Sequence, residues 1–363
     1  MRFVDAEKMF KQDRIRELAE SAEGLRYLKL RSLSRREHLE NLFTTLGMAV
    51  PTGAKAMFRA AFENPICDEK ILDLTIRSIY LKERAVRTKK EPSLVSELYK
   101  MLAFDWGGLQ QNSLEKTIID SYVKKITDFD ALNARIDNEL LNSLRGYVLC
   151  SWYNHWTSII IEDVFRDHVN VLPAVGQVKK IDFFVGKVPF DLKVTYLPEG
   201  FVKDLRKKDG HKPELTLLKK AARTKGIKFD KSMAEARLLE DLWNKIADHP
   251  DGDSELLVRE LRQYRLNVIS DCQEDSIGLI NWLYENQGVR RFDASNRLFL
   301  VLIDKSNFFA SWRLKRAKPL LNKQINQYLD SVGTSPGRQV DFMWESESYT
   351  SISDVVFIVH PEN

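Results

Sequence analysis

Two aspartates and a lysine, Asp182, Asp191 and Lys193, stand in two short β-prone runs near the middle of the chain. The two runs are joined at Gly186-Lys187. Glycine in the first position of a two-residue connection suits a type II′ turn, which holds two antiparallel strands with their native twist. Such a turn fixes the register and therefore decides which side chains face one another.

The predicted register brings like charges together. Counting outward from the turn places Asp182 opposite Asp191, and Lys180 opposite Lys193. Directly opposed side chains have Cβ atoms about 4.5 to 5.5 Å apart, so the two carboxylates repel unless a cation offsets the repulsion. A hard divalent cation with oxygen ligands, Mg²⁺ above all, is the natural partner.

The hairpin is also segregated into two faces, because side chains alternate along a strand. A wholly apolar face fits a core, and the opposite face gathers the charges. The apolar face carries Ile181, Phe183, Val185, Val188, Phe190, Leu192 and Val194, and the other carries Lys180, Asp182, Phe184, Pro189, Asp191, Lys193 and Thr195.

Lys193 beside a metal site suggests phosphodiester hydrolysis. An ammonium group can position a water that the metal has acidified, while the metal neutralises charge on the phosphoryl oxygen. A helix expected from about His155 to His168 carries Glu162 at the edge of its apolar stripe. Glu162 is a candidate metal ligand, although helical periodicity alone fits a surface glutamate equally well.

These residues resemble the PD-(D/E)xK nuclease superfamily, whose best-known members are the type II restriction endonucleases. Asp182 and Asp191-Leu192-Lys193 match the motif, Ile181 stands where the family often has proline, and the tripeptide also occurs at Asp68-Glu69-Lys70 in a segment expected to be helical. The resemblance implies Mg²⁺, with Mn²⁺ as a possible substitute, held by Asp182, Asp191, the backbone carbonyl of Leu192 and Glu162. It also implies that Lys193 lies near the attacking water.

The elements that must position these residues form an α/β fold, which the pattern predicts as a restriction-endonuclease-like mixed β-sheet core flanked by helices. An all-helical region at 1–112, with breaks at Pro51 and Pro92, would serve DNA recognition or dimerisation. A nuclease domain at 113–363 would contain a basic helical insertion at about 199–291. The expected strands are 169–172, 178–185, 188–197, 298–303 and 355–359.

The first part of the insertion is strongly basic and is a candidate contact for double-stranded DNA, with a solvated helical surface as the alternative. The candidate DNA-binding residues are Lys180, Lys203, Arg206, Lys207, Lys208, Lys219, Lys220 and Arg223. The net charge of +4 is too small to establish a nucleic-acid partner by itself.

Other classes of protein find less support. Three widely spaced cysteines and six scattered histidines favour buried thiols over a disulfide framework or a zinc hydrolase. The apolar runs are too short to span a bilayer, and residues 1–5 form no apolar signal core, so we expect a cytoplasmic prokaryotic protein with no membrane partner. Trp152, Tyr153 and Trp156 are expected in the core rather than as base-stacking platforms.

The sequence therefore favours a Mg²⁺-dependent site-specific endonuclease of the type II restriction kind. The resemblance to type II restriction endonucleases also implies two partners: a second copy of the chain in a homodimer, and a cognate DNA methyltransferase encoded nearby. A structure-specific, defence or repair nuclease of the same fold is the alternative within the enzyme class. A non-catalytic DNA-binding protein is the alternative from another class, although a binder has no need of paired aspartates.

Overall fold

The computed structural model describes residues 1–362, and the side chains of all of these except Asn112, Gln177 and Arg290. A six-stranded mixed sheet lies at its centre, in the order β1-β2-β3-β4-β6-β5. Strands β3, β4 and β6 are mutually parallel, and the other neighbours are antiparallel. The strands are β1 (Val171–Val178), β2 (Ile181–Val185), β3 (Val188–Tyr196), β4 (Arg297–Asp304), β5 (Arg338–Trp344) and β6 (Glu347–His360).

Helices cover both faces of the sheet, which explains why β4 is apolar on both sides. Leu298 and Leu300 pack against α9 (Leu141–Arg166) and α15 (Lys318–Val332). Phe299 and Val301 pack on the other face against α13 (Gly252–Glu274) and α14 (Ile277–Glu285). A strand buried on both faces has no polar alternation, and β4 is recognised in the sequence by its continuous apolar run.

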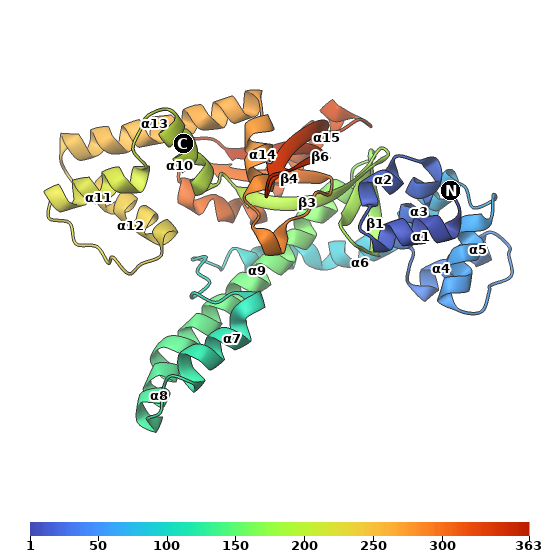
Figure 1. Cartoon of the computed structure of the whole chain (residues 1–363), viewed down its shortest axis with the longest axis horizontal. Coiled ribbons are helices and arrows are strands. Elements are labelled where there is room, and N and C mark those ends of the chain that lie inside the picture. The colour runs from blue at the N-terminus through green and yellow to red at the C-terminus, as the bar shows by residue number, and fades with distance from the viewer. Residues whose placement is uncertain (363) are drawn as a thin grey trace.

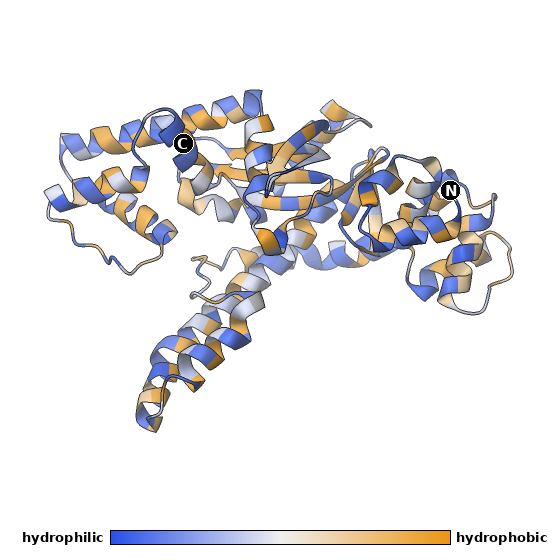
Figure 2. Cartoon of the chain, viewed as in Figure 1, coloured by the Kyte–Doolittle hydropathy of each residue, from blue (hydrophilic) through white to orange (hydrophobic). Residues whose placement is uncertain are grey.

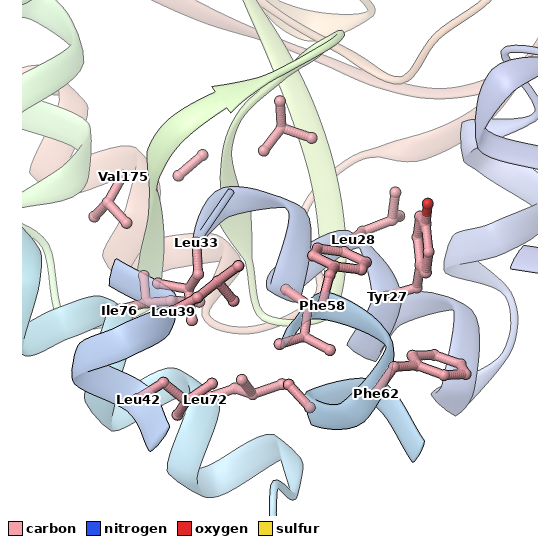
Figure 3. Packing of buried hydrophobic residues seen from close by; sticks show 14 of the residues in the cluster. Tyr27, Leu28, Leu33, Leu39, Leu42, Phe58, Phe62, Leu72, Ile76 and Val175 are labelled. Atoms are coloured by element: carbon pink, nitrogen blue, oxygen red, sulfur yellow. The ribbon is translucent and has the colours of Figure 1, made fainter. Parts of the chain in front are cut away.

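The amino-terminal helices form a core of their own that extends onto the sheet. Figure 3 shows Tyr27, Phe58 and Phe62 packed together, with Val175 of β1 in the same cluster. Phe184 of β2 is fully buried in this cluster as well. The helices are α1 (Phe3–Lys11), α2 (Ile15–Ala19), α3 (Ala22–Ser32), α4 (Arg36–Thr45), α5 (Ala54–Glu63) and α6 (Glu69–Leu98).

Helix α6 corrects one expectation, because it continues through Pro92 rather than ending there. Proline removes one backbone hydrogen bond from a helix and usually breaks it. Here the neighbouring Glu91 is buried and paired with Arg84 and with Lys318, and Leu98 lies in a core with α9. Tertiary packing on both sides of the proline thus holds the helix together.

The expected helical insertion is present and falls into two parts. Helices α13 and α14 cover the sheet, whereas α11 and α12 build a separate small core around Leu218, Leu242 and Trp243 with part of α13. Figure 1 shows this second part extending away from the sheet on the side opposite the amino-terminal helices. The remaining bounds are α10 (Glu199–Lys208), α11 (Glu214–Thr224), α12 (Glu235–Ala247) and the 3₁₀ turn η4 (Val289–Arg291).

A third projection is a helical arm that leads into α9. Figure 1 shows the chain running outward through α7 and back through α8 into α9. Figure 2 shows hydrophobic and hydrophilic residues mixed along this arm. Its elements are η1 (Gln111–Ser113), α7 (Leu114–Ile118), the π-helical turn η2 (Ile119–Val123), α8 (Phe129–Arg135) and the π-helical turn η3 (Ile136–Leu140).

The strand predictions differ from the structure both at the edges of the sheet and inside it, where β6 begins at Glu347 rather than at residue 355. Strand β3 matches its predicted bounds within one residue, but β1 is longer than expected, β2 begins at Ile181, and the pattern misses β5. β5 alternates buried Val340 and Phe342 with exposed neighbours, and its apolar positions are too few to mark a strand by pattern alone. The 3₁₀ segment η5 (Phe308–Arg316) connects β4 to α15.

Candidate active site

The hairpin of β2 and β3 forms as the turn predicts. Gly186 has φ of 58°, Lys187 has no positive φ, and Val185 pairs with Val188. The paired ladder extends outward as far as Phe183 and Phe190. Beyond that pair, β3 continues beside β4 from Asp191 onward, and the backbone N–H of Asp191 donates to the carbonyl of Asn296.

The divergence of the two strands changes one part of the expected register. Lys180 does not belong to the ladder, because it lies in the tight turn between β1 and β2 with φ of 62°. Its Nζ lies 3.2 Å from Oδ2 of Asp293 and 3.7 Å from Oδ2 of Asp13. The predicted juxtaposition of Lys180 with Lys193 is therefore wrong, and Lys180 is already paired with carboxylates.

Asp182 lies at the point where the strands separate. Its Oδ2 accepts a hydrogen bond of 2.8 Å from the backbone N–H of Leu192, so the side chain reaches across to β3. Burial raises the pKa of Asp182, the Leu192 N–H works against that rise, and the negative charge of Asp191 adds to it. The charges of the two aspartates thus interact, but the ladder ends at Phe183 and Phe190 and does not pair Asp182 directly with Asp191 as predicted.

Asp191 and Lys193 project from the same face of β3. Nζ of Lys193 lies 2.7 Å from Oδ1 of Asp191, and the lysine side chain is 46% exposed while that of Asp191 is 11% exposed. The pair thus joins a nearly buried acid to a cation that solvent and substrate can reach.

The sequence did not indicate Arg297, which neighbours Asp191 across the parallel ladder. Its Nε lies 3.5 Å from Oδ2 of Asp191, and its guanidinium lies over the ring of Tyr284. Arg297 is buried at the start of an apolar strand. A charged residue at the start of an apolar strand is the only feature of the sequence that could have drawn attention to Arg297. Its contact with Asp191 depends on the parallel pairing of β3 and β4, which a single sequence does not reveal.

Glu162 approaches the same site from α9. Its Oε2 pairs with Nη2 of Arg166 at 2.7 Å, and Arg166 also donates to the backbone carbonyl of Asp182 at 3.2 Å. Burial raises the pKa of Glu162, Arg166 works against that rise, and the charge of Asp182 adds to it. The helix therefore brings Glu162 close enough to Asp182 for the charge of the aspartate to raise its pKa.

Charges within this group balance without a metal. Three carboxylates face three cations, so the folded site carries little net charge. The acids are Glu162, Asp182 and Asp191, and the bases are Arg166, Lys193 and Arg297. A divalent cation bound among the acids would make the site positive, and a phosphate group would then be attracted to it.

The donor set fits Mg²⁺ better than a metal that needs a complete protein cage. Within residues 1–362, no three His, Cys, Asp or Glu side chains form a ready-made metal cluster. Mg²⁺ usually binds through one or two carboxylates and takes its remaining ligands from water and substrate phosphate. Asp182 and Asp191 supply two carboxylates of that kind. The roles of the Leu192 carbonyl and of Glu162 as further donors stay predictions, since Glu162 does not complete a group of three acidic ligands within residues 1–362.

The second copy of the acidic tripeptide has a structural role. Asp68 caps the start of α6, where its Oδ1 accepts the backbone N–H of Ile71 at 2.8 Å. Glu69 pairs with the buried Nζ of Lys29 at 2.7 Å. Both residues are thus accounted for by helix capping and ion pairing.

The basic residues of α10 and α11 divide into accessible and inaccessible groups. Arg206 is a correction, because it is buried, lies over the ring of Tyr264 and donates to the carbonyl of Lys212. A phosphate cannot reach it there. Lys203 and Lys219 are half-buried, Lys203 pairs with Glu235, and the exposed candidates are Lys207, Lys208, Lys220 and Arg223.

The structure also tests the predictions for the cysteines, the aromatic residues of α9 and membrane-spanning segments. Cys67, Cys150 and Cys272 are buried free thiols. Tyr153 is fully buried, and Trp152 and Trp156 are partly buried against the same core. Among the described helices, none combines the length and apolar composition needed to cross a bilayer.

Comparison of the chain with family models, curated proteins and solved structures finds no match.

Proposed function

We propose that this protein is a Mg²⁺-dependent endonuclease that hydrolyses phosphodiester bonds in double-stranded DNA, most consistent with a site-specific enzyme of the type II restriction kind. The observation that carries the proposal is the meeting of Asp182, Asp191 and Lys193 where β2 and β3 diverge. Asp191 is offset by Lys193 and Arg297, whereas among the described residues the largely buried carboxylate of Asp182 accepts one hydrogen bond, from the Leu192 N–H, and forms no salt bridge. A buried carboxylate with so few partners is costly unless a cation binds it.

In this proposal each side chain of the site has a separate role. Asp182 and Asp191 hold the Mg²⁺ ion, with the Leu192 carbonyl and Glu162 as additional donors, and Mn²⁺ substitutes for it. The bound ion supplies Lewis-acid stabilisation of the charge that develops on the phosphate. Lys193 exchanges its contact with Asp191 for the attacking water and orients it toward phosphorus. Arg166 keeps the backbone of β2 and the carboxylate of Glu162 in place.

Substrate binding falls to the accessible cations on α10 and α11, which follow the catalytic strand directly in the chain. A homodimer would bring two such sites to the two strands of a duplex, and a cognate methyltransferase would protect the host's own sites. Both partners belong to the proposal. The nuclease of defence or repair with a structured substrate is the alternative.

The experiment is digestion of plasmid and phage DNA by the purified protein with Mg²⁺, with Mn²⁺ and with EDTA. Discrete fragments that require a divalent ion are expected, and sequencing their ends would give the recognition site. A metal-dependent smear would point to the less specific nuclease. Intact plasmid, phage and branched DNA in every lane would refute the proposal and favour the non-catalytic DNA-binding protein.

A further inference from the structure

A cavity of about 740 Å³ opens beyond the carboxyl ends of β3 and β4. Its walls come from segments far apart in the sequence: the loop after α6, the end of β3, helix α12 of the insertion, and η5. In open α/β sheets, ligands commonly bind outside the carboxyl ends of the strands. This volume is typical of pockets that bind a small molecule or one part of a larger ligand.

The cavity combines aromatic and polar side chains. Phe104, Tyr196, Phe308, Phe309 and Trp312 contribute rings to its lining. Among the described residues, the buried hydroxyl of Tyr196 has no hydrogen-bond partner. Aromatic surfaces bind nucleobases by stacking, because every base has a π-face.

The polar lining mixes both charges: Arg237 pairs with Asp105 and Arg265 pairs with Glu199, so among the described lining residues Arg313 is the cation that has no salt bridge. Asn244 and Arg313 are exposed on the cavity wall, and Glu240 lies beside Arg237 and Arg313. Burial raises the pKa of Glu240 although both arginines oppose the rise. Guanidinium groups fit phosphate, while an amide and a carboxyl can meet the hydrogen-bonding edge of a base.

Strand β3 connects this cavity to the candidate active site. Thr195 lines the cavity and lies two residues beyond Lys193, so both side chains project from the same face of the strand. At about 3.3 Å per residue in a parallel strand, their Cα atoms are separated by roughly 7 Å. Duplex DNA advances about 3.4 Å per nucleotide along its axis. The part of the lining formed by Thr195 is therefore within about two nucleotides of Lys193.

We propose that this cavity binds one unpaired or extruded nucleotide of the DNA substrate, next to the phosphate that is cut. The inference rests on the proposed nuclease function and specifies its substrate: DNA in which a base near the cut leaves the duplex. Binding an extruded base in the cavity orients the neighbouring phosphate at Asp191 and Lys193.

The test measures binding without cleavage. The full-length protein is titrated in EDTA with two short duplexes, one fully paired and one carrying a single unpaired 2-aminopurine, whose fluorescence reports stacking. The variant Ala236→Trp fills the cavity from the exposed start of α12. The control Ala247→Trp adds the same side chain at an exposed position of α12 outside the cavity lining.

The wild type should bind the unpaired duplex about 10-fold more tightly, with quenched fluorescence, as base stacking on aromatic rings predicts. Ala236→Trp should abolish the preference and Ala247→Trp should keep it. Equal binding of both duplexes by the wild type, or a preference that survives Ala236→Trp, would overturn the inference. Cleavage is scored separately in Mg²⁺: a protein that cuts DNA without the preference refutes the cavity alone, and one with the preference that never cuts refutes the nuclease alone.

Discussion

At Asp182, burial and hydrogen bonding act in opposite directions on one carboxyl group. Burial and the nearby charge of Asp191 raise its pKa, whereas the N–H of Leu192 stabilises the ionised form. The folded protein therefore keeps the carboxylate at a cost that a bound cation would offset. This balance is typical of a functional site, since a purely structural aspartate would be matched by more donors.

The variant Asp182→Asn should make the metal-free protein more stable. Because the pKa is raised in the folded state, ionisation costs stability at pH values above the folded pKa and costs nothing below the unfolded value of 3.8. Asparagine still accepts the Leu192 N–H. In EDTA at pH 8, we expect the melting temperature to rise by about 1 to 3 °C. The gain should shrink as the pH falls toward 4, and a gain that is independent of pH would contradict the account.

Lys193 is predicted to act in the chemical step rather than in folding. Replacing it by methionine keeps the aliphatic stem and removes the ammonium, so the single-turnover cleavage rate should fall by about 10²- to 10⁴-fold. Lys187→Met is the matched control, because Lys187 is exposed in the turn of the same hairpin. Cleavage by Lys193→Met at the rate of the control would exclude the role of Lys193.

At the scale of elements, the hairpin was the most predictable part of the site. The turn residues, the alternation and the apolar face predicted β3, the pairing near the turn and the approach of Asp182 to Asp191. The departure of β3 toward β4 was not predictable, because parallel pairing depends on residues about 100 positions away in the sequence. That departure brought Arg297 to the site, whereas Lys180 lies elsewhere because of the tight turn between β1 and β2.

Gly186 should be essential to the geometry of the hairpin. Its φ of 58° is disfavoured for other residues, and an added Cβ would lie 2.1 Å from the carbonyl oxygen of Thr334. We expect Gly186→Ala to lower the free energy of unfolding by about 1 to 3 kcal/mol. Gly210→Ala is the control, because Gly210 has φ of 76° and no atom within 4 Å of the added Cβ. Equal decreases in urea denaturation would show that the proximity of Thr334 does not matter.

The exposed cations of α10 and α11 should determine the salt dependence of DNA binding. Changing the four exposed candidates to alanine should weaken binding at low salt and reduce the slope of log Kd against log salt by about one for each phosphate that is no longer neutralised. The control removes four exposed cations from the helical arm and α9, so the net charge changes equally. An equal effect in both variants would mean that only overall charge matters. The two sets are Lys207, Lys208, Lys220 and Arg223, and Lys116, Lys124, Lys125 and Arg145.

At the scale of the whole molecule, the sheet is surrounded by three helical projections (Figure 1). The division into helical and mixed regions followed from periodicity, but the packing between them did not. Leu172, Val175 and Phe184 join the amino-terminal core, so the boundary near residue 112 does not separate two hydrophobic cores. The division at that residue stays a prediction. The sequence of a strand shows that both of its faces are apolar. It does not show which distant helix covers each face.

The most direct test of the proposed active site compares two aspartates within the same acidic tripeptide pattern. Asp191→Asn should lower the rate of Mg²⁺-dependent DNA cleavage by at least about 10³-fold while DNA binding in EDTA is retained. Asp68→Asn should cleave at the wild-type rate, because asparagine also caps a helix well. Loss of cleavage in Asp191→Asn alone is the predicted result. Wild-type cleavage by Asp191→Asn would show that the site at the β2–β3 divergence is not the catalytic centre.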